Sequence, residues 1–444
     1  MITSAKHKLL ILFLIVCFSG NVFAIQINNF HLKNGMEVVH IPSKRIPAIA
    51  HLVWYKAGAM DEPIGKSGIA HLFEHLMFKK TENLADGEFS KTIAVNGGDD
   101  NAGTSQDYTV YHQAIAKKHL SLVMSLEAER MKNLVVNKNS VKNEIDIVIE
   151  ERNMRVDNNP KALLREKMKK ALYRDHPYAT PVIGWKDEIK ALTKDDALNF
   201  YKTYYSPNNA ILVVAGDVTI DQIKSLAEKH YGELEISKIE QKHLPKLSPL
   251  EKSQIIKQSN PSVKKSEFLR YYLAPSALSE GNKHTEALSV LSQILGGGET
   301  SRLYQKMVMD EHLVTKIGSY YDSISKGESI FGFYAIPKDK VKFEKISTTI
   351  EEEIRNIIKN GIPKDALTRA QNILKADFIY AQDGLKNMAF IYGRAITTGL
   401  SADYITKWPE RISKVTEDDI IQAAKYIFEN KHSVTGFLTG EEND

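Results

Sequence analysis

Ile69-Ala-His-Leu-Phe-Glu-His-Leu-Met-Phe78 is the stretch that decides how this chain folds around its chemistry. Its apolar residues recur at the spacing of an amphipathic helix, which turns about 100° per residue, and they form one stripe. The opposite face carries His71, Glu74 and His75. Because residues four apart are neighbours on a helix, both imidazoles can reach one zinc ion. The segment therefore predicts a metal-binding helix, and an exposed helix face with the same residues is the alternative.

Glu74 is placed to act as a general base rather than as a ligand. It lies beside His75 and is rotated slightly from both imidazoles, so it can contact a water without binding the metal. A catalytic zinc ion also needs a third protein ligand and an open position. Glu144 and Glu151 are candidates, because they lie seven residues apart and share one face of a predicted helix. Helical spacing alone does not choose between them, and two solvated acids are the alternative.

The pattern of strands and helices predicts an α+β fold with two homologous half-domains, each a mainly antiparallel sheet packed with helices. Residues 25–235 form the first predicted domain and 266–444 the second, with a linker at 236–265 where lysines and prolines cluster. In the first domain we expect strands at 37–41, 49–55, 105–115 and 210–217, and helices at 67–80, 120–134 and 141–173. The order begins again with a strand at 268–273 and a helix at 284–295.

Two capped helices indicate the duplication. Leu192-Thr-Lys-Asp-Asp196 precedes a predicted helix and strand, and Val415-Thr-Glu-Asp-Asp419 precedes a similar pair 223 residues later. Thr193 and Thr416 are the predicted helix N-caps. Two unrelated capped helices would explain the local match alone, but the recurring order of strands and helices favours a repeat.

Residues 1–24 have the layout of a secretory signal peptide. Lys6 and Lys8 precede an apolar run of ten residues, and Val22-Phe23-Ala24 resembles a cleavage site. A short buried helix is one alternative, and a lipid anchor at Cys17 is another. We expect export across the inner membrane to the periplasm, and a mature chain without cysteine that uses neither disulfides nor thiol chemistry.

The composition excludes several classes of protein. Hydrophobic residues make up 43% and charged residues 26%, as in soluble globular proteins rather than disordered ones. The net charge is only +4, with acids and bases interspersed, which argues against nucleic-acid binding. The 14 histidines are scattered, which argues against zinc buffering. No later segment is long and apolar enough to predict a membrane span.

The segment with His71, Glu74 and His75, and the later segment with Glu144 and Glu151, resemble the pitrilysin and insulinase family of metallopeptidases, which has an inverted zinc motif. The resemblance is to the short two-domain branch of that family, which includes mitochondrial processing peptidase. Glu151 stands 76 residues after His75, the separation at which the family carries its third zinc ligand. Glu144 matches another important family glutamate, which we expect to orient the ligands rather than bind metal. The resemblance implies a zinc metalloendopeptidase with one Zn²⁺ per chain, acting on peptides or unfolded segments.

Further segments carry the same resemblance. Gly97-Gly-Asp-Asp-Asn-Ala-Gly-Thr-Ser-Gln-Asp-Tyr-Thr-Val-Tyr111 is similar to the family segment in which an edge strand pairs with the substrate backbone. It implies substrate contacts at Asn101 and Ala102, and a polar hairpin loop is the alternative. His176-Pro-Tyr178 and Ser301-Arg-Leu-Tyr304 match other family segments.

One position departs from the family. Active members, or their partner subunits, carry an arginine and a tyrosine that hold the substrate, and the matching positions here are Val308 and Thr315. Tyr320 or Tyr321 is a possible replacement for the tyrosine. We expect a heterodimer in which a related non-catalytic subunit supplies Arg and Tyr. The alternative is a non-catalytic, zinc-containing subunit that binds peptides or acts as a scaffold.

Overall fold

The computed structural model describes residues 27–239, 244–429 and 431–440. The predicted signal peptide, with Cys17, lies outside the described residues. Within the described part of the chain, no helix combines the length and the apolar character needed to cross a bilayer.

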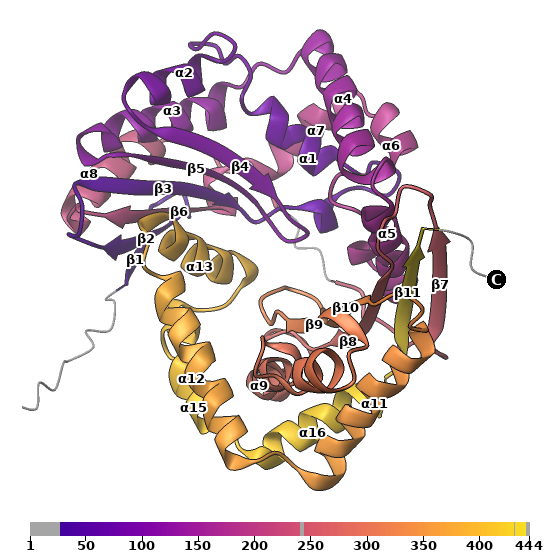
Figure 1. Ribbon diagram of the computed structural model, residues 1–444. Coiled ribbons are helices and arrows are strands. Elements are labelled where there is room, and N and C mark those ends of the chain that lie inside the picture. Colours follow the sequence, from indigo (N-terminus) through magenta and orange to yellow (C-terminus); the bar gives the residue numbers. More distant parts are fainter. Residues whose placement is uncertain (1–26, 240–243, 430, 441–444) are drawn as a thin grey trace, which may run out of the picture.

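Two mixed sheets, each mainly antiparallel, form the framework (Figure 1). The first has the order β1-β2-β6-β3-β5-β4 and the second the order β7-β11-β8-β10-β9. Each contains a single parallel pair, β2 with β6 and β7 with β11. The first sheet comprises β1 (Asn28–His31), β2 (Glu37–Pro42), β3 (Ala48–Tyr55), β4 (Asp99–Thr104), β5 (Thr109–Ala116) and β6 (Ala210–Gly216). The second comprises β7 (Gln254–Ser259), β8 (Glu267–Ala274), β9 (Val314–Tyr321), β10 (Ser329–Pro337) and β11 (Ser433–Thr439).

The two sheets match strand for strand once β1 is set aside, which confirms the predicted fold of two similar halves. The capped helices occupy equivalent places: α7 (Lys194–Tyr204) precedes β6 and α16 (Glu417–Phe428) precedes β11. Both begin with a capping box, in which the threonine side chain accepts a hydrogen bond from the third helical residue while that residue's carboxylate accepts one from the threonine N–H. These threonines are Thr193 and Thr416, as predicted.

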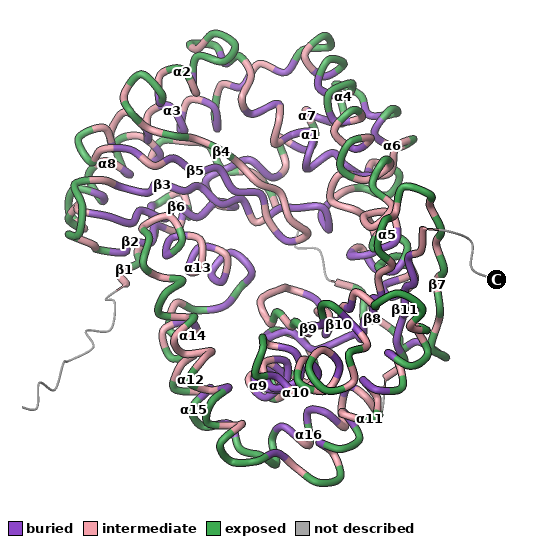
Figure 2. Tube along the Cα trace, in the orientation of Figure 1, coloured by how far each residue is buried: buried purple, intermediate pink, exposed green. Residues whose placement is uncertain are grey.

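Helices cover one face of each sheet. Strand residues alternate between faces, so every second residue joins this core. In the first half the covering helices are α1 (Ile69–Leu76), α3 (Leu120–Asn133), α7 and α8 (Ile220–Tyr231). In the second half they are α9 (Thr285–Gly296), α11 (Phe343–Asn360), α12 (Lys364–Ala381) and α16. Figure 2 shows the resulting burial, concentrated along the strands of both sheets, with exposed residues on the outer turns of the helices.

The opposite faces are covered by exchanged helices. Helix α5 (Pro160–Tyr173), from the first half, packs on β8 and β11 of the second sheet. Helix α13 (Leu385–Thr398), from the second half, packs on β3 and β6 of the first (Figure 1). The approach is close, since a Cβ added at Gly393 of α13 would lie 2.3 Å from Trp54 Nε1. The two halves therefore interlock rather than sit side by side.

Three expectations about the elements need correction. The predicted linker 236–265 contains β7, which pairs with β11 at the edge of the second sheet. The helix predicted at 141–173 is two helices, α4 (Lys138–Arg152) and α5, separated by a π-helical turn at Asn153–Asp157 and restarted by the Asn159 cap and Pro160. The strand predicted at 105–115 is β5, and the separate strand β4 precedes it.

The remaining helices are α2 (Glu88–Val95), α6 (Lys186–Lys190), α10 (Arg302–Tyr304), α14 (Ala402–Thr406) and α15 (Trp408–Lys414).

Candidate metal centre

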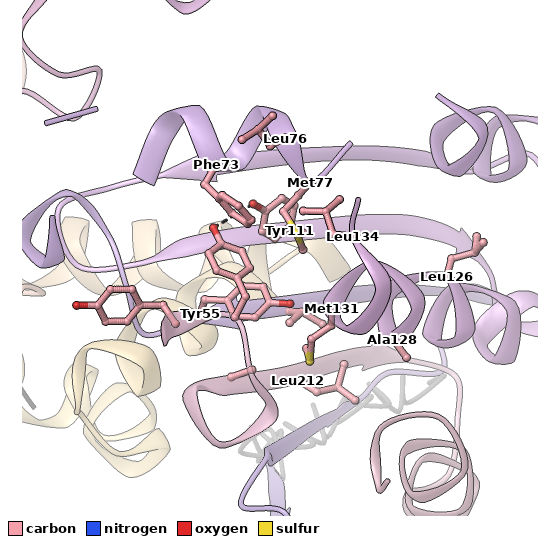
Figure 3. Packing of buried hydrophobic residues seen from close by; sticks show 14 of the residues in the cluster. Tyr55, Phe73, Leu76, Met77, Tyr111, Leu126, Ala128, Met131, Leu134 and Leu212 are labelled. Carbon is pink, nitrogen blue, oxygen red and sulfur yellow. Dashed lines mark hydrogen bonds between the residues drawn. The ribbon is translucent and has the colours of Figure 1, made fainter. Parts of the chain in front are cut away.

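Helix α1 is fixed firmly by its apolar side and by its first turn. Phe73 stacks on Tyr201 and packs against Tyr205, and it belongs with Leu76 and Met77 to the buried hydrophobic cluster of the first half (Figure 3). The helix starts after a glycine in the left-handed conformation, and no side chain of that residue can cap it. The carboxylate of Glu62 takes this role, accepting hydrogen bonds from two backbone N–H groups of the first turn, both at 3.0 Å. Packing and capping together set the direction of the polar face.

His71, His75 and Glu151 meet at one point. Glu151 Oε2 lies 3.6 Å from His71 Nε2 and 3.4 Å from His75 Nε2. One ligand atom from each of the three residues lies within 4.8 Å of the others, and this is the one such group of histidine, cysteine or acidic residues found in the described chain. An ion about 2 Å from each donor separates those donors by roughly 3 to 3.5 Å. The donor set and its spacing therefore fit a zinc ion.

Glu144 faces the other side of His75. Its Oε2 lies 3.2 Å from His75 Nδ1, and its Oε1 lies 2.6 Å from Lys79 Nζ. The Glu144 side chain is only 4% exposed. When His75 donates its Nδ1–H to this carboxylate, Nε2 is left with a lone pair directed at Glu151. Helical spacing left Glu144 and Glu151 equivalent, and the structure separates them by the imidazole nitrogen that each one faces.

Glu74 is held beside this group by the edge strand. Its Oε2 accepts a hydrogen bond from Thr104 Oγ1 at 2.5 Å, and Thr104 is the last residue of β4. Burial raises the pKa of Glu74, and the Thr104 hydrogen bond opposes the rise. A carboxylate with a raised pKa is better suited to accept and return a proton near neutral pH.

The two imidazoles differ electrostatically. Burial, the neighbouring His75 and the cation of Arg155 together lower the pKa of His71 to about 3, so His71 is neutral at physiological pH. Burial acts in the same direction on His75, but the Glu144 hydrogen bond and the charges of Glu151 and Glu74 raise its pKa overall. A neutral imidazole is the form that binds metal.

Asn101 and Ala102 lie on β4, which pairs with β5 and forms the edge of the first sheet. Asn101 is exposed, and its side-chain oxygen accepts a hydrogen bond from the Ala102 N–H. Thr104, at the end of the same strand, donates a hydrogen bond to Glu74, so the strand edge lies next to the candidate base. This geometry suits an extended chain added alongside β4.

Sequence reasoning missed three supporting residues. Lys79 and Arg155 stand four residues after His75 and Glu151, a spacing that predicts neighbours on one helix face. In the structure Lys79 lies just past the end of α1, and Arg155 lies in the π-helical turn after α4. Arg155 Nη1 lies 2.8 Å from Glu151 Oε1, which leaves Oε2 facing the imidazoles. That spacing was a usable signal for both cations. Glu62, by contrast, reaches α1 through a loop and leaves no periodic signal.

In the described part of the second half, the positions that match the family's arginine and tyrosine are Val308 and Thr315. Val308 lies in a π-helical segment, and Thr315 is exposed at the start of β9, where its hydroxyl donates to a backbone oxygen. The Tyr321 hydroxyl donates its hydrogen to the backbone oxygen of Pro275, so that hydrogen is not available to a substrate. Tyr320 is 43% exposed, with its ring lying over Gly332.

Comparisons with known proteins find relatives of both halves of the chain. The family described as insulinase (peptidase family M16) matches residues 38–186, and the peptidase M16 inactive domain matches 191–374. The zinc protease PqqE of Helicobacter pylori is 32% identical over 417 residues, covering 92% of this chain and 91% of that protein. The crystal structure of a protease from Helicobacter pylori superposes with a TM-score of 0.86 at 30% identity, covering 94% of this chain and all of the other. The first half of the periplasmic protease PqqL from Escherichia coli shares the fold, with a TM-score of 0.78 at 17% identity over 94% of this chain and 92% of that one.

Proposed function

This chain belongs to the insulinase family of peptidases, family M16, and from that premise we propose that it is a zinc metalloendopeptidase acting on peptides or unfolded polypeptide segments. The observation that carries the proposal is the meeting of His71, His75 and Glu151, with Glu74 beside them. The relatives named as zinc proteases support the choice of metal. The narrow strand edge at β4 supports an extended rather than a folded substrate.

His71, His75 and Glu151 would hold one Zn²⁺ through two imidazole nitrogens and one carboxylate oxygen. When bound, the ion supplies Lewis-acid chemistry, lowering the pKa of water and polarising a carbonyl. Glu144 and Lys79 position His75, since the carboxylate bridges the Nδ1 of the imidazole and the ammonium group. Arg155 positions Glu151 in the same way.

Glu74 is the proposed general base and acid. It accepts a proton from the water that attacks the scissile carbonyl carbon, and a C–O bond forms. It then gives that proton to the leaving amine nitrogen as the C–N bond breaks. The raised pKa of Glu74 suits both steps, and Thr104 holds the carboxylate toward the site. Asn101 and Ala102 are the proposed substrate contacts on β4.

We further propose that the chain works as the catalytic subunit of a heterodimer. Val308 and Thr315 stand where the family places an arginine and a tyrosine, and neither side chain can replace those donors. A related chain would supply both groups. Turnover should therefore be low for the purified chain and rise when the related chain is added, and full turnover by the chain alone contradicts this assembly.

A non-catalytic, peptide-binding or scaffold subunit is the second candidate. The missing arginine and tyrosine favour it. The domain described as inactive covers residues 191–374 only, outside the segment that holds His71, His75 and Glu151, and is compatible with both candidates. Cleavage of a quenched peptide library by the chain with its partner separates the two candidates, because a scaffold subunit binds peptides without cleaving them.

Glu74→Gln tests the enzymatic proposal. The substitution keeps the size of the side chain and removes its ability to take a proton, so turnover should fall by about 10²- to 10⁴-fold while zinc content is unchanged. Glu150→Gln, at an exposed acid of α4, is the matched control and should retain activity. Unchanged peptide cleavage by Glu74→Gln contradicts the assignment of the base.

Export to the periplasm is proposed from the sequence of residues 1–24, and a periplasmic relative of the same fold supports it. The test is to determine the N-terminal residue of the protein recovered from a periplasmic fraction. We expect it at Ile25, whereas an intact Met1 in a cytoplasmic fraction contradicts export.

A further inference from the structure

A lysine-lined cavity lies at one end of the second sheet, and the proposed reaction does not use it. Its volume is about 1330 Å³, and its walls come from the ends of β7 and β11, the loops at 264–266 and 338–342, and the start of α11. Asp339 and Glu344 are its two carboxylates. It contains six exposed lysines: Lys257, Lys264, Lys265, Lys338, Lys340 and Lys342.

Among the described residues, the ammonium groups of this lysine-lined cavity are not paired with carboxylates. None of the six forms a salt bridge with a carboxylate in the described ranges, whereas lysines elsewhere, such as Lys79 and Lys161, do. The whole chain carries a net charge of only +4, so this cavity gathers six positive charges in an almost balanced protein. Six lysines outnumber the two carboxylates in the lining, and a concave surface on which one sign of charge dominates attracts ligands of the opposite sign.

The backbone adds to the positive potential. Helix α11, 18 residues long, begins at the cavity wall, and its N-cap residue Lys342 makes no side-chain capping hydrogen bond. The N-terminus of a helix carries a partial positive charge and unsatisfied N–H groups. Lys340 adopts a left-handed conformation with φ of 67°, which is uncommon for a residue with a side chain. The chain therefore keeps a lysine where glycine would be less strained.

The floor of the cavity is apolar and lies beside a strand edge. Phe343 stacks on Phe437, with ring centroids 4.5 Å apart and planes 2° from parallel. Lys257 of β7 is directly opposite Phe437 of β11, and β7 is the edge strand of the second sheet. Such a site suits an extended chain, whose backbone can follow the strand edge while its acidic groups reach the lysines.

We propose that the lysine-lined cavity binds an acidic, extended polypeptide segment, rich in Asp and Glu, away from the catalytic residues. The volume exceeds the roughly 300–1,000 Å³ of small-molecule sites, which favours a polymer. The concave shape argues against a flat lipid surface. The lysines offer single charges and the lining contains no arginine fork, the group favoured for bidentate phosphate recognition. The choice of a peptide over other polyanions rests on the proposed function.

The test measures binding separately from cleavage. A fluorescein-labelled Glu-rich peptide is titrated into the Glu74→Gln protein and followed by fluorescence anisotropy, with a Gln-rich peptide of equal length as the neutral probe. We expect binding of the Glu-rich peptide alone, with an affinity that weakens as salt is raised. Equal binding of both peptides overturns the proposal.

Charge reversal locates the binding site. Lys264→Glu, Lys265→Glu and Lys340→Glu together should weaken binding at least about tenfold at low salt. Lys33→Glu, Lys44→Glu and Lys138→Glu form the matched control, because these exposed lysines of the first half change the net charge equally. The control should lose less than about twofold. Equal losses in the two triple variants, both shown to be folded by thermal unfolding, overturn the assignment.

Two further probes distinguish the sources of negative charge. A single-stranded oligonucleotide of matched charge and vesicles containing phosphatidylglycerol are titrated in the same way. Tighter, cavity-dependent binding of either one overturns the peptide assignment. Cleavage assays keep this inference separate from the proposed function. Binding of the acidic peptide without any peptide cleavage contradicts the proposed function alone. Cleavage of neutral peptides without binding of the acidic peptide contradicts the proposed acidic-peptide site alone.

Discussion

Helices α1 and α9 occupy equivalent places in the two halves, each following the strand at the centre of its sheet, yet of the two only α1 carries residues of the candidate metal group. Both bury an apolar side against their sheets. The free face of α1 presents His71, Glu74 and His75, whereas the acid of α9, Glu286, is bound to Arg411 at 2.6 Å. The duplicated framework thus fixes where each helix lies. A few side chains on its free face decide whether that helix can contribute to a metal site.

The edge strands next to these helices differ in the same way. In the first half, β4 is polar and carries Thr104 to Glu74. In the second half, Ser319 of β9 donates a hydrogen bond to the backbone of α9, and the position expected to hold a tyrosine is Thr315. Within the described residues, the second half packs on the first sheet through the exchanged helix α13 and contributes no residue to the candidate metal group.

The largest effect is expected from removing a ligand on α1. His75→Ala should reduce the zinc content from one per chain to almost none and lower peptide cleavage by at least about 10³-fold, because two protein donors do not retain the metal. The measurements are metal analysis and cleavage of a quenched peptide. Ser289→Ala on α9 is the matched change in the other half and should leave both unchanged. Retained zinc in His75→Ala would break the contrast between the two helices.

A smaller effect is expected from the residues that orient His75. Lys79→Met removes the cation that holds Glu144, and Glu144→Gln weakens the acceptor of the imidazole N–H. Loss of such an outer partner typically costs 10- to 100-fold in metal affinity, and we expect values of about that size for Glu144→Gln and somewhat less for Lys79→Met. Competition with a zinc chelator measures both. Unchanged zinc affinity in Glu144→Gln would show that His75 is oriented by packing alone.

The smallest effect concerns the interlock between the halves. Gly393→Ala places a Cβ 2.3 Å from Nε1 of the fully buried Trp54 ring, so the ring or the helix must shift. We expect a loss of about 1–3 kcal/mol in the free energy of unfolding, more than the roughly 1 kcal/mol gained in helix propensity. Gly436→Ala meets the flexible end of Met168 and should cost less.

Denaturant unfolding compares these two variants with Gly384→Ala, where the nearest atom is 3.6 Å from the added Cβ. A Gly393→Ala protein as stable as Gly384→Ala would contradict the close packing of α13 on the first sheet.

The elements found from sequence are those with local signals. The apolar stripe of α1, the Thr193 and Thr416 caps and the alternating strands are written within single segments. The sequence predicts a linker where strand β7 lies, because lysines and prolines, among them Pro249 and Pro261, cluster there without clear periodicity. The exchange of α5 and α13 depends on which distant sheet offers a matching apolar face, and no local pattern carries that information.

In the candidate site, too, some residues could be predicted from local spacing and others could not. His71, Glu74 and His75 follow from helix geometry, while the choice of Glu151 over Glu144 needed either the family resemblance or the structure. Distances settle which imidazole nitrogen each carboxylate faces, because side-chain directions at the ends of two packed helices are not set by spacing alone.

Anomalous diffraction at the zinc edge, from crystals of the purified chain, tests the central claim most directly. The account predicts one strong peak per chain, about 2.0–2.2 Å from His71 Nε2, His75 Nε2 and a Glu151 oxygen, with Glu74 outside bonding distance. A peak bound by Glu144 instead of Glu151, or no peak between the two histidines in zinc-saturated protein, would contradict it.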